Sequence, residues 1–334
     1  MRFYESPRWS NEIADCSMPM TFDTYSNCAF SCIYCFSMYQ RALGGKASAY
    51  LNKQVKHVNT EKVKAIFKLE RPSQFENYIK SRKVFQWGGL SDQFDGFERK
   101  YGKTLELLKF FKEIDYPISF STKSTWWLKD KRYTDLFKGQ KNWNVKFSII
   151  TLDEYKAREI ERGVPSPKER LEAIKRFTDL DAGGATLRLR PFIIGVSSPT
   201  YPELIAKAAE AGATALSTEF FCLETRSRVL RQYLPVLNKL AGYNIFEFYK
   251  KYSSCRSGYL RLNRNIKRPF MVKMQELAHS LGMRFYVSDA HFKEMSDGAN
   301  CCGLPTHWNY SRGHWSQALQ IAKQKKDNIV KFSD

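Results

Sequence analysis

Three cysteines stand close together in one short stretch, Asn27-Cys28-Ala29-Phe30-Ser31-Cys32-Ile33-Tyr34-Cys35-Phe36. Their CxxxCxxC spacing puts three thiols on a single loop, with the aromatic Tyr34 directly before the last of them. Thiolates are soft ligands that hold iron–sulfur clusters and zinc. A closed zinc site or a cubane cluster uses four protein ligands. As metal ligands, Cys28, Cys32 and Cys35 would therefore leave one iron open to a small molecule.

Two other interpretations of these thiols are a zinc knuckle with a distant fourth ligand and a disulfide cluster. Neither is favoured, because no paired CxxC and no histidine lies near the loop. Eight cysteines in 334 residues are also too few for a disulfide scaffold of this size.

The loop closely resembles the cysteine loop of the radical S-adenosylmethionine (radical SAM) enzymes. The resemblance implies a 4Fe-4S cluster whose open iron chelates the amine and the carboxylate of S-adenosyl-L-methionine (SAM). It implies that one-electron reduction cleaves SAM to methionine and a 5′-deoxyadenosyl radical. The electron would come from a donor such as a flavodoxin or a ferredoxin.

Length and composition indicate a folded α/β protein. The 334 residues are enough for a barrel plus an appendage, and 43% hydrophobic residues exclude a disordered chain. The first residues are polar and are not followed by an apolar run, so we expect no signal peptide. No stretch is apolar for the length of a bilayer, so we expect no membrane partner and a cytoplasmic location.

The formal charge is +20, which favours a polyanionic partner. Residues 220–334 contain 19 Lys and Arg against 8 Asp and Glu. Within residues 250–273 no acid occurs, and tyrosines and a phenylalanine are interleaved with the basic groups, a pattern that suits phosphates and stacked bases. The alternative is a solvated helical face or a basic loop. The residues predicted to contact nucleic acid are Lys250, Lys251, Arg256, Arg261, Arg264, Lys267 and Arg268.

Strand-like and helix-like segments alternate along the chain, as a parallel sheet requires. We expect strands at 18–25, 84–87, 118–121, 145–150, 185–194 and 213–218. We expect helices at 61–69, 74–81, 104–114, 166–178, 202–211, 226–240 and 269–281, and a further strand at 284–287. The helix at 166–178 should begin with a capping box, because Ser166 is a good N-cap and Glu169 follows three residues later. The first six strands and their helices fit a partial (β/α)6 TIM-type barrel. The domains predicted are an N-terminal extension (1–17), the barrel (18–220) and a basic α/β C-terminal substrate-binding extension (221–334).

Four ordered blocks within residues 20–220 resemble the spore photoproduct lyase-like branch of the radical SAM proteins. They include Gly88-Gly89-Leu90-Ser91-Asp92-Gln93-Phe94-Asp95-Gly96-Phe97-Glu98 and Ser121-Thr122-Lys123-Ser124. The other two are Phe147-Ser148-Ile149-Ile150-Thr151-Leu152-Asp153 and Pro165-Ser166-Pro167-Lys168-Glu169-Arg170-Leu171-Glu172-Ala173-Ile174. In such barrels the chemistry sits on the loops after the strands.

The resemblance implies a set of SAM contacts at the strand ends. Glycine lets the backbone approach the methionyl part, and hydroxyl and carboxylate oxygens accept hydrogen bonds from its ammonium. A lysine and two arginines would hold the carboxylate, a serine the ribose, and an isoleucine the adenine. The cofactor-binding residues are thus Tyr34, Gly88, Gly89, Ser91, Asp92, Lys123, Ser124, Ser148, Arg188, Arg190 and Ile193.

The chain departs from the lyases in one respect. They have a hydrogen-donating cysteine just before the Ser/Asp segment, where this chain has Gly88-Gly89-Leu90. The catalytic candidates are instead Cys222, Cys302 and His291. Cys222 is alternatively a small core residue; Cys302, with Cys301, is alternatively part of a substrate-loop turn or of a second cluster with Cys255. The closing aromatic segment from His307 to Trp315 either stacks on a base or seals the barrel.

The sequence therefore predicts a radical SAM enzyme that abstracts hydrogen from a nucleic-acid substrate. Because the lyase cysteine is missing, we favour modification or rearrangement of a thymine-derived DNA base. Alternatives are lyase-like DNA repair and radical modification of a peptide or a small metabolite. A zinc-dependent nucleic-acid-binding protein is the alternative that is not an enzyme.

Overall fold

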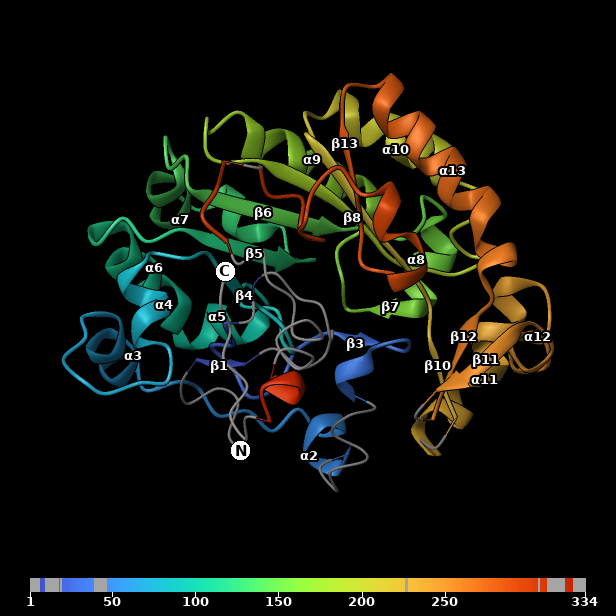
Figure 1. Cartoon of the computed structure of the whole chain (residues 1–334), viewed down its shortest axis with the longest axis horizontal. Helices are drawn as coiled ribbons and strands as arrows, with labels where there is room; N and C mark the ends of the chain where they lie inside the picture. The colour runs from blue at the N-terminus through green and yellow to red at the C-terminus, as the bar shows by residue number, and fades with distance from the viewer. Residues whose placement is uncertain are drawn as a thin grey trace.

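The centre of the fold is a curved sheet, with helices on its outer side (Figure 1). The computed structural model describes residues 7–9, 18, 20–38, 47–225, 228–256, 258–305, 307–310 and 322–326. In this part of the chain the sheet has eight strands. In spatial order they are β1 (Arg8–Trp9), β2 (Met20–Phe22), β4 (Phe85–Trp87), β5 (Ile118–Thr122), β6 (Trp143–Ser148), β8 (Ala185–Phe192), β9 (Ala215–Phe220) and β13 (Arg284–Val287).

All neighbouring strands from β2 to β13 are parallel, and β1 is antiparallel to β2. The six strands predicted for the barrel occupy consecutive places in this order. The predicted partial TIM-type barrel is therefore confirmed. The strand predicted at 284–287 forms as β13, and it extends the same sheet by pairing with β9.

Helices between the strands cover one face of the sheet. They are α3 (Thr60–Phe67), α4 (Glu76–Lys80), α5 (Gly96–Tyr101), α6 (Lys103–Glu113), η1 (Trp126–Lys129), α7 (Lys131–Phe137), α8 (Glu154–Ile160), α9 (Pro167–Thr178), α10 (Tyr201–Glu210) and α13 (Arg264–Ser280). The capping box predicted for α9 is present: the Ser166 hydroxyl accepts from the Glu169 backbone, and the Glu169 carboxylate accepts from Ser166.

Side chains alternate between the two faces of the barrel strands. Aromatic and aliphatic side chains face the helices: Trp87 packs edge-on against Phe111 of α6, and Phe147 against Phe177 of α9. The opposite, inner face is polar. Its residues are Gln86, Ser119, Ser121, Asn144, Lys146, Ser148, Thr186, Arg188, Arg190 and Ser217. An inner face of this kind leaves the barrel interior chemically equipped to bind a polar ligand.

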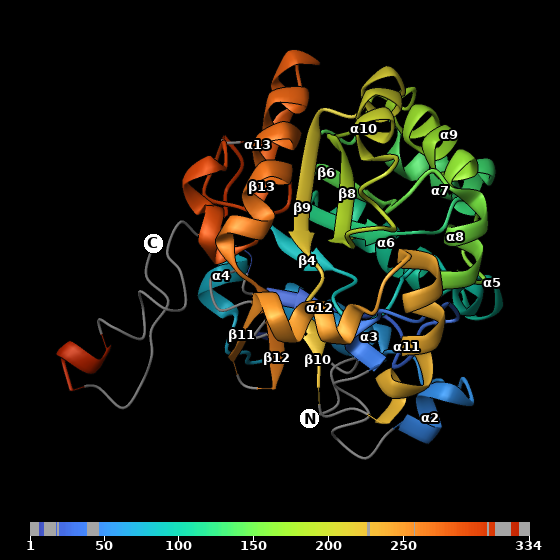
Figure 2. The same ribbon diagram turned by 90° about the vertical axis from the view of Figure 1, so that its right-hand side faces the viewer.

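A second, small sheet lies beyond the carboxyl ends of β8 and β9 (Figure 2). It consists of β10 (Leu223–Glu224), β12 (Tyr259–Leu262) and β11 (Ser253–Arg256), all antiparallel. The helices α11 (Arg228–Ala241) and α12 (Ile245–Tyr252) adjoin it. Residues 250–273, in which basic and aromatic side chains are interleaved without an acid, thus include the end of α12, the strands β11 and β12, and the first part of α13.

The other end of the barrel is closed by the segment after η2 (Ala290–Met295). The backbone N–H of Val84, just before β4, donates to the Asn309 carbonyl at 2.8 Å, and Tyr310 is 6% exposed beside Val84. The described part of the closing aromatic segment therefore seals the barrel. Its members Arg312, His314 and Trp315 lie outside the described residues. Each helix described is too short or too polar to cross a bilayer.

Candidate active site

The cysteine loop begins after β2 and is held at two places by backbone and amide contacts. Its strand β3 (Ser31–Cys32) pairs antiparallel with β7 (Glu161–Arg162), so that Cys32 lies opposite Glu161. The Asn27 amide nitrogen lies 3.0 to 3.2 Å from three carbonyls in and after α2 (Ala47–Leu51), and its oxygen accepts from the Cys28 backbone at 2.8 Å. The loop is therefore fixed at its start and at its middle before any metal binds.

The three thiols are unpaired and largely shielded from solvent. Burial raises the pKa of Cys32 to about 12, while the positive charge of Lys123 lowers it. Burial and the carboxylate of Asp95 raise the pKa of Cys28 well above its ordinary value. Without a cation the Cys28 and Cys32 thiols thus stay protonated, and a bound metal would have to displace their protons.

The donor set fits a cluster with three protein ligands. Three free thiols come from one loop, which matches the soft donors that iron–sulfur clusters use. In the metal-free arrangement no three His, Cys, Asp or Glu side chains of the described residues, these thiols included, are placed to hold a single metal ion. The fit therefore lies in the donor chemistry and in the shared loop. All three thiols lie near one cation, because each of them acts electrostatically on the Lys53 ammonium.

The glycines after β4 lie where side chains would collide. A Cβ on Gly88, whose φ is +91°, would lie 2.1 Å from Oε1 of Gln93, and one on Gly89 would lie 2.8 Å from Oγ1 of Thr21. Both polar side-chain atoms of Gln93 are buried without a hydrogen-bond partner among the described residues. Such an orphaned amide costs about 1–3 kcal/mol. The Gln93 amide therefore has one donor and one acceptor that could hydrogen-bond a ligand bound beside the glycines.

Ser91 and Asp92 are already engaged within the protein. The Ser91 hydroxyl and backbone N–H both donate to the Asp23 carboxylate at the end of β2, at 3.1 and 2.8 Å. Asp92 accepts from the Thr122 hydroxyl at 2.9 Å and from the Lys123 backbone at 2.6 Å. Burial raises the pKa of Asp92, and these hydrogen bonds oppose that rise. Both residues thus tie neighbouring strand ends together beside the glycines.

The Lys123 ammonium is unpaired by any carboxylate among the described residues and lies 5.7 Å from the centre of the Tyr34 ring. The Tyr34 hydroxyl donates to the Glu161 carboxylate. Ser124 is buried, and its carbonyl accepts from the Trp127 indole at 3.2 Å. Lys123 and Tyr34, predicted from different parts of the chain, are therefore neighbours, whereas Ser124 is bonded to its own turn.

Ser148 and Arg188 meet on the inner face, where β6 and β8 pair in register. The Arg188 guanidinium donates to the Ser148 hydroxyl at 3.4 Å. Burial and the nearby Arg190 lower the pKa of Arg188 to about 10. Arg190 forms an ion pair with Glu219 of β9, and Ile193 is fully buried after β8. The residues predicted to contact the carboxylate, the ribose and the adenine therefore lie on β8, on the adjacent strand β6 and directly after β8.

A buried ion pair that the sequence did not reveal lies behind this group. Glu161 and Arg170 approach to 2.7 Å, and each side chain is 1% exposed. Arg170 also donates to the Ser148 carbonyl at 2.7 Å. The pair therefore joins the cysteine loop, through Tyr34, to the end of β6. Glu161 lies in the two-residue strand β7 and Arg170 within α9, and neither position gave a signal in the sequence.

The catalytic candidates Cys222 and His291 lie near the rim, at the ends of β9 and β13. The half-buried Cys222 thiol donates to the Phe220 carbonyl at 3.7 Å, and burial raises its pKa to about 12. His291 lies 3.1 Å from the Lys267 ammonium, which forms an ion pair with Asp289. Asp289 and Lys267 also act electrostatically on Cys222. These four side chains therefore belong to one rim cluster.

Cys302 is elsewhere, inside the barrel. Its sulfur lies 3.9 Å from Oε1 of Gln86 and 4.0 Å from the Cys301 sulfur. The pKa of Cys302 is lowered well below its usual value, first by the hydrogen bond with the Cys301 thiol and then by the Lys146 ammonium, whereas burial acts in the opposite direction. Burial thus favours the protonated form of the Cys222 thiol at the rim, whereas the neighbours of Cys302 favour its thiolate form.

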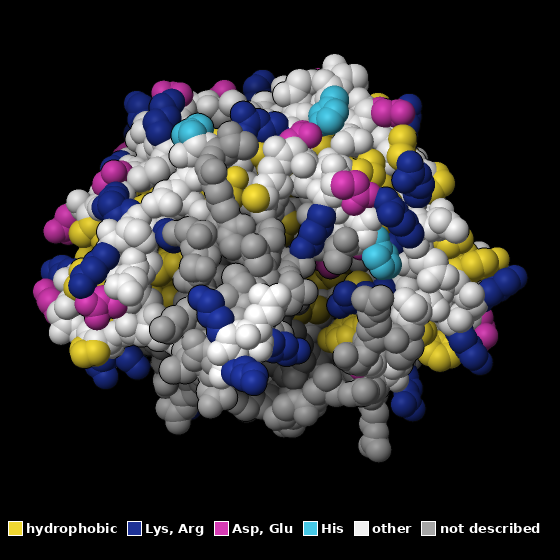
Figure 3. All heavy atoms as spheres, in the orientation of Figure 1, with side chains coloured by type: hydrophobic (Ala, Val, Ile, Leu, Met, Phe, Trp, Pro, Cys, Tyr) yellow, Lys and Arg dark blue, Asp and Glu magenta, His cyan; other side chains and the backbone are white. Residues whose placement is uncertain are grey.

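The basic residues predicted for nucleic acid are divided by the fold. Lys250, Lys251, Arg261, Arg264 and Arg268 are exposed on α12, β12 and α13. Lys267 is 2% exposed and ion-paired, so it does not belong to this surface. Arg256 is in β11, opposite Tyr259, and its side chain lies outside the described residues. In Figure 3 Lys and Arg side chains spread over the whole visible face.

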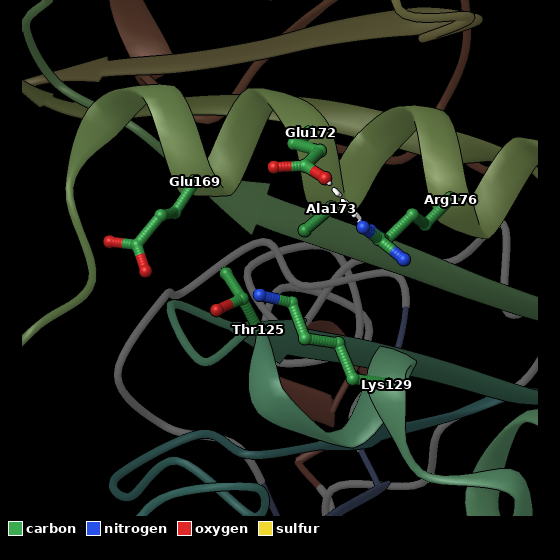
Figure 4. Close-up of a pocket in the computed structure, with 6 residues that line it drawn as sticks. All are labelled: Thr125, Lys129, Glu169, Glu172, Ala173 and Arg176. Atoms are coloured by element: carbon green, nitrogen blue, oxygen red, sulfur yellow. Dashed lines mark hydrogen bonds and ion pairs between the residues drawn. The ribbon is translucent and has the colours of Figure 1, made fainter.

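A pocket on the outer side of the barrel lies between η1 and α9 (Figure 4). Its lining mixes basic and acidic side chains, and Arg176 donates to Glu172 at 2.6 Å along α9, on one side of the pocket. It contains no predicted site residue. The lining residues are Thr125, Lys129, Glu169, Glu172, Ala173 and Arg176.

Solved structures of other proteins have a fold similar to that of this chain. No model of a protein family matches the sequence, and no curated protein matches it. A spore photoproduct lyase mutant with bound AdoMet and the dinucleoside spore photoproduct has 18% identity and a TM-score of 0.58, covering 85% of this chain and 81% of that one. Another mutant of the lyase has 18% identity, a TM-score of 0.60 and the same coverage. The chain has the fold of spore photoproduct lyase.

The predicted resemblance to the lyase-like radical SAM branch is thus confirmed in the fold. SuiB of Streptococcus suis, in complex with the precursor peptide SuiA, is also similar, with 14% identity and a TM-score of 0.51. The match covers 83% of this chain and 51% of SuiB. The same architecture therefore occurs in proteins whose ligands differ, and the substrate has to be inferred from the residues of this chain.

Replacing Lys123 by methionine is expected to weaken SAM binding about ten- to hundredfold, because a charged hydrogen bond contributes about 1.5–3 kcal/mol. Iron content should stay unchanged, since no cysteine ligand is removed. Anaerobic equilibrium dialysis measures SAM binding, and iron analysis of the same protein measures the iron content. Lys129→Met, an exposed lysine of η1, is the control and should bind as the parent does. Equal SAM affinity in Lys123→Met and the parent would remove Lys123 from the binding site.

Proposed function

We propose that this chain is a radical SAM enzyme in which Cys28, Cys32 and Cys35 hold a 4Fe-4S cluster. Bound together, the cluster and SAM supply a 5′-deoxyadenosyl radical that abstracts a hydrogen atom. The observation that supports this most is that Tyr34, within the cysteine loop, lies beside Lys123 and acts electrostatically on Arg188, which donates to Ser148. These contacts occur in a chain with the fold of spore photoproduct lyase.

The chain's own groups suit SAM in charge and in polarity. The Lys123 ammonium and the Arg188 guanidinium are cations that would bind a carboxylate. The glycine loop after β4 would accept the methionyl backbone, with the orphaned Gln93 amide beside it. The buried Ile193 follows β8 and would adjoin the adenine. The Glu161–Arg170 pair would keep Tyr34 and Ser148 oriented during the reaction.

The substrate we propose is DNA, and the target a thymine-derived base that is modified or rearranged. Arg261 and Tyr259 have the same parity on β12, at the end of the barrel where the cysteine loop also lies. Exposed cations of α12 and α13 flank them. Cations bind phosphates and aromatic rings stack on bases. A base in a duplex would have to be flipped out, at a few kcal/mol.

The rim cluster is where we place the chemistry on the substrate. Cys222 is held as a protonated thiol by burial, so it retains a hydrogen atom to donate. His291 and Lys267 lie with Asp289 in hydrogen-bonding reach and would handle a proton or a phosphate. Cys302, inside the barrel beside Lys146, is the second candidate thiol. We propose a cytoplasmic enzyme that receives its electron from a flavodoxin or a ferredoxin.

The experiment that tests the substrate is isotope transfer. The reconstituted enzyme is incubated anaerobically with SAM, dithionite and DNA whose thymines are deuterated, and 5′-deoxyadenosine is analysed by mass spectrometry. Deuterium in 5′-deoxyadenosine supports a DNA substrate. If 5′-deoxyadenosine forms without deuterium from thymine, whether the strand is single or double, a thymine-derived base is not the substrate. A peptide or a small metabolite, the other option of this fold, is then tested in the same way.

Replacing Arg261 by alanine is expected to weaken DNA binding about three- to tenfold and to reduce the salt dependence of binding by about one unit of slope. The reason is that each phosphate contact releases about one counterion. Filter binding across a salt series measures both values. Lys207→Ala, an exposed and ion-paired lysine of α10, is the matched control and should change neither. A parent protein that binds DNA without any salt slope would contradict the proposed interface.

A further inference from the structure

Lys53, two residues after α2, reaches back to the cysteine loop. Its ammonium donates to the Cys28 carbonyl at 3.0 Å and to the Phe30 carbonyl at 2.7 Å. Its backbone has a φ of 53°, a left-handed conformation that is uncommon for a residue with a side chain. The Tyr50 ring lies 4.8 Å from the same nitrogen. The ammonium of Lys53 therefore contacts Tyr50 of its own turn on one side and the carbonyls of the first half of the cysteine loop on the other.

The charge of Lys53 also faces the thiols. The ammonium lies 3.0 Å from the Cys28 carbonyl, within the loop that carries the thiols. Among the charged groups that act on it, Cys28, Cys35 and Cys32 come first and the Asp95 carboxylate follows. Among the described residues no carboxylate forms an ion pair with this ammonium, so the sulfur atoms are its strongest electrostatic partners.

We propose that Lys53 is a positioning residue for the cysteine loop and that its charge makes the cluster easier to reduce. The proposal rests on the proposed function, since it concerns the cluster held there. A cluster with three thiolate ligands gains one negative charge on reduction. A nearby cation stabilises the more negative state, because net charge and hydrogen bonding are the levers that set the potential of such clusters.

The test compares Lys53→Met, which removes the charge and keeps the length, with Lys53→Arg, which keeps the charge. Lys56→Met, an exposed lysine of the same segment, is the control. Each protein is reconstituted anaerobically, and its cluster is titrated with a redox mediator series by electron paramagnetic resonance. We expect the equilibrium constant for reduction to fall about tenfold in Lys53→Met, which is 59 mV for one electron. Lys53→Arg and Lys56→Met should stay near the parent.

A second measurement uses the metal-free chains and follows backbone hydrogen exchange in the loop. We expect faster exchange of the amides from Ala29 to Tyr34 in Lys53→Met than in Lys56→Met. An unchanged potential together with unchanged exchange would overturn the proposal. If the parent binds no iron at all, the proposed function fails, and the exchange measurement still decides whether Lys53 positions the loop.

Discussion

Replacing Cys32 by alanine is expected to remove the iron–sulfur cluster and, with it, all reductive cleavage of SAM. Cys32 is the middle one of the three thiols, 6% exposed and fixed by the pairing of β3 with β7. A cluster held by only two protein thiolates has lost one of its three bonds to the chain. Iron and sulfide analysis after anaerobic reconstitution measures the loss.

The control for this change is Cys301→Ala, which removes a thiol from the barrel interior instead of the loop. It should keep the iron content and the brown colour of the parent. Circular dichroism of the two metal-free variants should coincide with that of the parent, because one small buried side chain replaces another. Full iron content in Cys32→Ala would contradict the assignment of the ligands.

Replacing Arg170 by methionine is expected to destabilise the metal-free protein by about 3–5 kcal/mol. The change leaves the Glu161 carboxylate buried without its cation, and breaking one side of a buried pair has this cost. It also removes the donor to the Ser148 carbonyl. Chemical denaturation of the metal-free chain measures the free energy of unfolding.

The double variant Glu161→Gln with Arg170→Met is the matched control for this prediction. It removes the stranded charge, so it should be more stable than Arg170→Met alone, although both variants lack the ion pair. Arg176→Met, an exposed member of the same helix α9, should cost less than about 1 kcal/mol. A cost for Arg170→Met no larger than that of Arg176→Met would show that the pair does not hold the loop and β6 together.

The sequence was sufficient where local chemistry decides the structure. The alternation of strand and helix patterns predicted the parallel barrel, and Ser166 with Glu169 predicted the start of α9 to within one residue. The cysteine spacing and the polar residues at strand ends predicted neighbours that the fold brings together, such as Tyr34 and Lys123. These features depend on periodicity, capping and the common edge of parallel strands.

The sequence was insufficient where distant segments meet. Tyr34 and Glu161 are 127 residues apart, and two-residue strands such as β3 and β7 have no periodic pattern to find. The contact of Lys53 with the loop depends on how α2 turns back. Lys267 looked like its basic neighbours, yet its place on the inner side of α13 buries it against Asp289. Tertiary packing alone distinguishes these cases.

The proposed radical SAM activity is tested most directly when the reconstituted, oxygen-protected protein is incubated with SAM and dithionite, and 5′-deoxyadenosine and methionine are quantified by mass spectrometry. We expect both products in equal amounts, and neither of them without the cluster. A protein that takes up zinc and no iron, or that holds a complete 4Fe-4S cluster and releases no 5′-deoxyadenosine, would contradict it.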